Sequence, residues 1–177
     1  MLAPSVAKVN AVMQLANERP LRAFSITRRL GERFHTKTVS ALRTLVRLGI
    51  ARSVDRQGHA EYEPNPDSPY ADVARRLAFI DLGIRDLLPA EAKIVAIFVH
   101  GSLVDGRDNP ASDLDVLIVG NVDLRQARAA FAPLERMLGR AVDVSVRTAA
   151  QTRDGVEAAD RFTVDALAGM RVWGTWS

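Results

Sequence analysis

The segment HGSLVDGRDNPASDLDVLIVG, residues 100–120, places acidic residues where a folded chain ordinarily places apolar ones. Its second half, LDVLIV, is apolar enough to predict a buried strand, yet Asp113 and Asp115 stand at the start of that strand. Side chains alternate between the two faces of a strand, so the two carboxylates point to the same face and repel each other. A divalent cation would remove this repulsion.

A third acidic residue lies in another apolar segment. Asp143 is part of AVDVSV, residues 141–146, which also predicts a strand. Three carboxylates on adjacent strands can hold Mg²⁺ or Mn²⁺ for phosphoryl or nucleotidyl transfer. The chain has no cysteine, which excludes disulfides, thiol catalysis and cysteine-bound zinc. Asp113, Asp115 and Asp143 are therefore the expected metal ligands and catalytic residues.

Gly101 and Ser102 precede these acids and suit phosphate binding. Glycine lets a backbone approach a phosphate closely, and the serine hydroxyl and the following amides can donate to phosphate oxygens. Around this site the pattern predicts strands at 93–99 and 171–174, a helix at 123–139 and mostly helical structure over 148–170. The second module is therefore expected to be a small mixed sheet with helices on it.

Gly101-Ser102, ten intervening residues and Asp113-Leu114-Asp115 resemble, without insertion or deletion, the signature of nucleotidyltransferases of the DNA polymerase beta superfamily. The resemblance covers roughly residues 90–175 and is to the minimal version of the family. It implies that Asp113 and Asp115 bind the metals, that Asp143 activates the acceptor hydroxyl, and that Gly101, Ser102 and Ser112 hold the nucleotide. The implied substrate is a nucleoside triphosphate, with ATP favoured.

The segment departs from the family pattern in two places. Val104-Asp105-Gly106 replaces the usual Ala-Arg-Gly, so Arg107 is expected to supply the missing cation. His100 stands where an aromatic ring is common. Asp105 and Asp108 are interpreted as loop surface rather than metal ligands.

The first third of the chain carries a different charge. Residues 1–66 contain 11 Lys and Arg against 5 Asp and Glu, a net charge of +6, whereas the remainder carries −3. Apolar periodicity predicts helices at 5–17, after Phe24 with Ser25 as cap, and from Thr36, followed by a hairpin around Gln57-Gly58. The Pro-rich segment 63–69 ends this module.

This order is that of a winged helix-turn-helix, and LRTLVRLGIARSVDRQGHAEYEPNPDSPY resembles the recognition helix and wing of arsenic-repressor-like winged helices. The resemblance covers roughly residues 8–70 and implies binding to duplex DNA. Short polar side chains and cations on the third helix can reach base edges and phosphates, and those of the hairpin can reach the backbone. The expected DNA contacts are Thr36, Lys37, Thr38, Ser40, Arg43, Arg52 and Arg56. The alternative is a protein-docking module with solvated arginines.

Between the modules, Val73, Leu77, Ile80, Ile84 and Leu87 predict one connecting helix with a continuous apolar stripe. This stripe is either a homodimer surface or is covered by the chain's own domains. The predicted fold class is α+β: a winged helix-turn-helix (1–69), a connecting helix (70–89) and a polymerase-beta-like nucleotidyltransferase α/β domain (90–177).

Three functions are open. The chain is a Mg²⁺-dependent nucleotidyltransferase coupled to DNA binding, a nucleotide-sensing DNA-binding regulator with little turnover, or an antitoxin-like enzyme that adenylylates a partner toxin. A protein is one candidate acceptor. No apolar run approaches the roughly 18 residues of a membrane span, and no secretory pattern begins the chain, so the expected location is the cytoplasm.

Overall fold

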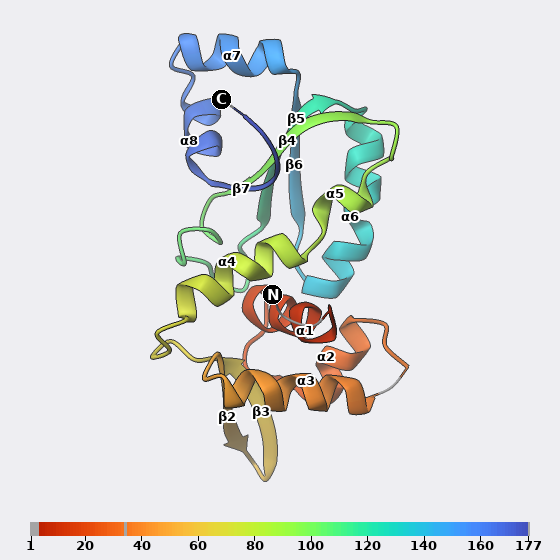
Figure 1. Cartoon of the computed structure of the whole chain (residues 1–177), viewed down its shortest axis with the longest axis vertical. Coiled ribbons are helices and arrows are strands. Elements are labelled where there is room, and N and C mark those ends of the chain that lie inside the picture. The colour runs from red at the N-terminus through yellow and green to blue at the C-terminus, as the bar shows by residue number, and fades with distance from the viewer. Residues whose placement is uncertain (1–3, 34, 177) are drawn as a thin grey trace. The chain divides into compact units, whose positions relative to one another are not determined.

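A computed structural model describes residues 4–33 and 35–176 (Figure 1). The chain forms two units. The first runs to Leu82 and includes Arg136–Gly139; the second comprises Gly83–Glu135 and the chain from Arg140 onward. No helix in the described part of the chain combines the length and apolar character that crossing a bilayer requires.

The first unit is helical with a small antiparallel sheet, in strand order β1-β3-β2. Its elements are α1 (Pro4–Leu15), β1 (Leu21–Arg22), α2 (Ala23–Arg29), α3 (His35–Arg47), β2 (Ala51–Arg56), β3 (His59–Pro64) and α4 (Ala71–Asp81). Its core contains Val9, Val12, Met13, Ile26, Leu42 and Leu45, among others. Burial of these side chains from three helices holds the unit together.

The predicted hairpin is present and extends beyond α3 (Figure 1). Its two turn residues, Gln57 and Gly58, both have positive φ, 56° and 77°. Such turns match the twist of the flanking strands. The carboxylate of Asp55 accepts a hydrogen bond from the Gly58 amide at 2.9 Å, which fixes the turn.

Two helix details differ from the sequence prediction. Helix α2 begins at Ala23 with Arg22 as its N-cap residue, so Ser25 lies inside the helix and is not the cap. Helix α3 buries Thr38, which was predicted to contact DNA. The stripe that packs is Thr38, Ala41, Leu42 and Leu45, because Ala41 and Thr38 are small enough to lie close to α1 and α2.

The predicted connecting helix is two helices. Helix α4 ends at Asp81, Gly83 adopts φ 61°, and a short α5 (Ile84–Leu87) follows in the second unit. Helix α4 buries Ala74, Ala78 and Phe79, so its core face is not the predicted stripe. The boundary therefore falls at Gly83 rather than in a separate segment 70–89.

The second unit is a four-stranded mixed sheet in the order β6-β5-β4-β7. Besides α5 it contains β4 (Lys93–His100), β5 (Leu114–Asn121), α6 (Leu124–Leu138), β6 (Val142–Arg147), α7 (Ala149–Glu157), α8 (Arg161–Ala168) and β7 (Met170–Gly174). Strands β5 and β6 are parallel and joined through α6, whereas β4 is antiparallel to both of its neighbours. The predicted mixed sheet is confirmed.

Candidate functional site

Three polar residues form a row across three neighbouring strands of the sheet. Asp115 on β5 pairs with His100 on β4 and with Asp143 on β6. Register partners on adjacent strands present their side chains to the same face, so all three lie side by side at one end of the sheet. Asp113 lies directly before β5, near enough for its charge to act on the Asp115 carboxyl.

The same face carries the helices that follow β6. The next residues along β4 and β5 on that face, Phe98 and Leu117, pack in one cluster with Ala166 of α8. The row of His100, Asp115 and Asp143 therefore continues an apolar face at the point where it meets solvent. This explains why the apolar strands β5 and β6 begin with acids: the sheet buries its middle and exposes this end.

Gly101 is required at the turn after β4. Its φ is 76°, a conformation that L side chains rarely adopt, and a Cβ at this position would overlap the Oδ2 atom of Asp115. The following loop is held by backbone bonds, including Arg107 N–H to Ser102 O at 2.9 Å. The glycine thus gives the Asp115 carboxylate room, a purpose that the sequence analysis had assigned to phosphate alone.

Burial and neighbouring carboxylates act together on the pKa of Asp115. Burial raises the pKa of the Asp115 carboxyl, Asp143 and Asp113 raise it further, and His100 lowers it. For His100, burial lowers the pKa, while Asp115, Asp143 and Asp165 oppose that change in part. The folded protein therefore disfavours the ionised form of Asp115.

The donor set fits a hard divalent cation. All three acids offer carboxylate oxygens, the ligands that Mg²⁺ and Mn²⁺ prefer, and the space beside Asp115 is kept open by Gly101. Over residues 4–33 and 35–176, no three or more His, Cys, Asp or Glu side chains are gathered closely enough to ligate an ion. The carboxylates share one end of the sheet without forming a ligand cage.

The predicted nucleotide-binding residues lie in the loop between β4 and β5. Arg107 forms an ion pair with Asp105, and both side chains are exposed. Surface pairs of this kind contribute about 0–1 kcal/mol, so Arg107 can exchange Asp105 for a phosphate at little cost. The Ser112 hydroxyl accepts a hydrogen bond from the Asn109 amide at 3.0 Å, which makes it part of the loop structure.

A buried ion pair in the same loop was missed by the sequence analysis. Arg140 donates to Asp108 Oδ2 at 2.9 Å, and the two side chains are 0% and 4% exposed. Arg140 also donates to the carbonyls of Asn109 (3.0 Å) and Ser112 (2.6 Å). The interpretation of Asp108 as loop surface is therefore wrong. No local pattern marks the pair, because its partners lie 32 residues apart.

The predicted DNA contacts divide into two groups. On α3, Thr36, Lys37, Ser40 and Arg43 are exposed, but Thr38 is buried and its hydroxyl has no hydrogen-bond partner in the described structure. Thr38 is thus not available for contact. In the hairpin, Arg52 pairs with Glu63 at 2.7 Å and Arg56 with Glu61 at 3.7 Å. Acidic neighbours partly neutralise both arginines.

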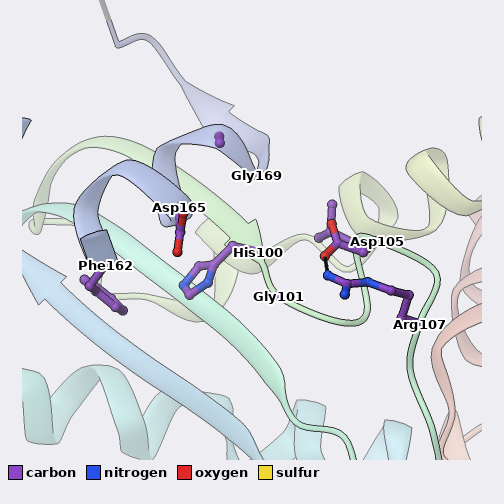
Figure 2. A pocket seen from close by; sticks show the side chains of 9 residues that line it. His100, Gly101, Asp105, Arg107, Phe162, Asp165 and Gly169 are labelled. Atoms are coloured by element: carbon purple, nitrogen blue, oxygen red, sulfur yellow. Dashed lines mark hydrogen bonds and ion pairs between the residues drawn. The ribbon is translucent and has the colours of Figure 1, made fainter. Parts of the chain in front are cut away.

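Helix α8 contributes residues that the sequence analysis did not select. Phe162 packs against His100 edge to face, with ring centroids 5.7 Å apart, and Asp165 also lies close to His100 (Figure 2). Both come from a stretch predicted only as helical with weak periodicity. Their spacing of three residues on a helix, aromatic followed by acidic, was the available signal.

Residues 83–165 match a family described as nucleotidyltransferase domain. No curated protein and no solved structure matches the chain. The matched range begins at Gly83, where the second unit begins, and contains Gly101, Ser102 and the three carboxylates. The first unit lies outside it. The match supports the nucleotidyltransferase part of the resemblance noted from Gly-Ser and Asp-x-Asp, over residues 83–165.

Proposed function

We propose that the second unit transfers a nucleoside monophosphate from an NTP, ATP in particular, to a hydroxyl acceptor in a Mg²⁺-dependent reaction. The observation that carries this proposal is the row of carboxylates beside Gly101 within a nucleotidyltransferase domain. Asp113, Asp115 and Asp143 would hold Mg²⁺ or Mn²⁺, which would neutralise charge developing on the phosphoryl oxygens.

The remaining steps fall to this chain's own residues. Asp143 accepts the proton of the acceptor hydroxyl as its oxygen attacks the α-phosphorus. The bond from that phosphorus to the bridging oxygen breaks, and pyrophosphate leaves with the electron pair. Gly101, Ser102 and Arg107 bind the triphosphate. Asp143 suits the base because it is the exposed member of the row, at an edge strand that an acceptor can reach.

A thermal-shift experiment tests this site. Mg²⁺ or Mn²⁺ with ATP is expected to raise the melting temperature, since a ligand of the folded state at about 100 times its Kd stabilises by about 2.7 kcal/mol. Asp113→Ala should abolish the shift, and Asp154→Ala, an exposed carboxylate of α7, should retain it. Equal responses from wild type and Asp113→Ala would contradict the assignment. A shift without pyrophosphate release would instead favour the nucleotide-sensing regulator.

We also propose that the first unit is a winged helix-turn-helix that binds duplex DNA. In support, α2 and α3 precede the β2–β3 hairpin, and Thr36, Lys37, Ser40 and Arg43 are exposed together on α3. The net charge of +6 over residues 1–66 favours a polyanion. The chain would then be a DNA-binding regulator with a nucleotidyltransferase domain. The antitoxin-like alternative stays a weaker proposal, since nothing observed identifies a toxin.

Salt dependence and mutation distinguish contacts with DNA phosphates from contacts that determine sequence preference. Duplex affinity is expected to fall steeply with salt, and Arg56→Ala should weaken binding to all sequences alike, with a salt slope smaller by about 1. Lys37→Ala or Arg43→Ala should change sequence preference. Arg153→Ala, an exposed arginine of α7, is the charge-matched control. Absence of duplex binding at low salt would contradict the proposal, and binding that ignores salt would contradict phosphate contacts.

We further propose a two-fold dimer through α4, because one short recognition helix reads a half-site and dimers read two. The α4 face opposite the core exposes Val73 and Ile80, 56% and 48% exposed. Ile80→Glu should therefore give a folded monomer with weakened DNA binding, observed by sedimentation at micromolar concentration. Ile84→Glu is not equivalent, because Ile84 is buried. A wild-type monomer under these conditions would exclude the dimer.

A further inference from the structure

The second unit holds a cavity of about 510 Å³ next to Gly101 (Figure 2). Its volume lies in the usual range of small-molecule sites. Residues from the loop after β4 and from α8 line it, among them His100, Gly101, Arg107, Phe162 and Asp165. His100 is both a wall of this cavity and the register partner of Asp115, so the cavity begins where the row of carboxylates ends.

Charge divides the cavity into two ends. Arg107 is the one cation among its described lining residues, and it lies with Asp105 on one side of His100 (Figure 2). Phe162 and Asp165 lie on the other side. A triphosphate carries several negative charges and is repelled by the Asp165 carboxylate, whose ion-pair partner Arg161 is not among the described lining residues. A nucleotide in this cavity therefore directs its phosphates toward Gly101 and Arg107, and its base toward Phe162.

The aromatic end suits a flat ring. Phe162 is 36% exposed, yet its ring is held in place by Arg147, whose guanidinium carbon lies 4.9 Å from the ring centroid, and by His100. Arg147 is itself fixed by a hydrogen bond to Asp160 at 3.0 Å. A fixed aromatic side chain is a stacking platform for a nucleobase, and such stacking tolerates any base.

Because stacking on Phe162 tolerates any base, selectivity among nucleobases must come from Asp165. An ionised carboxylate only accepts hydrogen bonds, so it favours a base edge that donates. Its ion pair with Arg161 is 3.5 Å long, and the two side chains are 67% and 95% exposed, so solvent and ligand compete for it readily. The exocyclic amino group of adenine is a donor of the required kind, whereas unsubstituted purine offers none there.

We propose that Phe162 and Asp165 form the nucleobase subsite of this domain and select an amino-bearing purine such as adenine. The proposal rests on the proposed nucleotidyltransferase function and adds to it the residues that discriminate the base. Both residues lie on one helix, α8, so the subsite is separate from the carboxylates that act on the phosphates.

Binding to the full-length protein in Mg²⁺ tests the subsite with three probes: ATP, purine riboside triphosphate, which lacks only the amino group, and tripolyphosphate. Wild type is expected to bind ATP roughly tenfold more tightly than purine riboside triphosphate, as a hydrogen bond to a charged group requires. Asp165→Ala should bring the two affinities together. Phe162→Leu should weaken both nucleotides by roughly tenfold. Neither variant should weaken tripolyphosphate, and Asp154→Ala should behave as wild type.

The outcomes separate this inference from the proposed function. If wild type binds both nucleotides equally, or if Asp165→Ala keeps the preference for ATP, the subsite is wrong while nucleotide binding stands. If wild type binds none of the three probes, the proposed function fails and the subsite fails with it. The preference for ATP is a ratio within one variant, so partial unfolding does not change it. For Phe162→Leu, unchanged tripolyphosphate binding shows that the loss of nucleotide affinity is not caused by unfolding.

Discussion

Asp115→Asn is expected to reduce pyrophosphate release from ATP by about three orders of magnitude, the rate equivalent of several kcal/mol of transition-state stabilisation. Asparagine keeps the size of the side chain and the space that Gly101 leaves for it, but it removes the negative charge at the centre of the row. The measurement is pyrophosphate release with Mg²⁺ and a cell lysate as the source of acceptor. Asp154→Asn, in the same unit, should retain wild-type activity.

The same substitution is expected to stabilise the protein at neutral pH. The folded state raises the pKa of Asp115 above its ordinary value of 3.8, so the folded protein binds this proton more tightly than the unfolded chain does. Stability is therefore lost as pH rises from below 3.8 through the folded pKa, and the full penalty is present at pH 7. Asparagine has no such penalty.

Measuring the free energy of unfolding at two pH values checks whether Asp115→Asn stabilises the protein. The gain from Asp115→Asn should be largest near pH 7 and vanish near about pH 3, where the carboxyl is protonated in both states. An inactive variant that is less stable at pH 7 would indicate that Asp115 supports the fold rather than the reaction. A variant that keeps its activity would remove Asp115 from the proposed site.

Much of the site could be predicted because its residues are close in sequence or lie in strands. Asp113 and Asp115 interrupt an apolar strand, and Gly101-Ser102 stands at a fixed distance before them. Strand alternation then determines which face they share. Asp143 was identified in the same way, as an acid within an apolar run, and the register places it opposite Asp115.

Other features depend on packing, which periodicity does not report. The apolar periodicity from Val73 to Leu87 continues across Gly83 in the sequence. In the structure, Gly83 has a positive φ, which lets the chain turn there and separates α4 from α5. Thr38 was assigned to the solvent face by its polarity, although its small size lets it pack with Ala41 and Leu42. The contacts of His100 with α8 join residues more than 60 positions apart. Because these contacts link distant parts of the chain, no local sequence pattern reveals them.

Asp108→Ala is the substitution expected to cost most in stability. It would leave the Arg140 guanidinium buried and without its carboxylate, and breaking a buried ion pair by removing one partner costs about 3–5 kcal/mol. Asp105→Ala is the matched control in the same loop, since it removes an exposed pair worth about 0–1 kcal/mol. Both tryptophans, Trp173 and Trp176, follow α8, so their fluorescence during urea unfolding reports on the second unit.

The double variant Asp108→Leu/Arg140→Met distinguishes a lost charge pair from lost packing. Replacing both partners by apolar side chains of similar volume leaves no buried charge, so the double variant should be markedly more stable than Asp108→Ala. It should still be impaired in ATP turnover, because Arg140 also holds the carbonyls of Asn109 and Ser112 in the loop that leads to Asp113. Equal stability losses for Asp108→Ala and Asp105→Ala would contradict the buried pair. Full turnover by the double variant would show that Asp113 is positioned without Arg140.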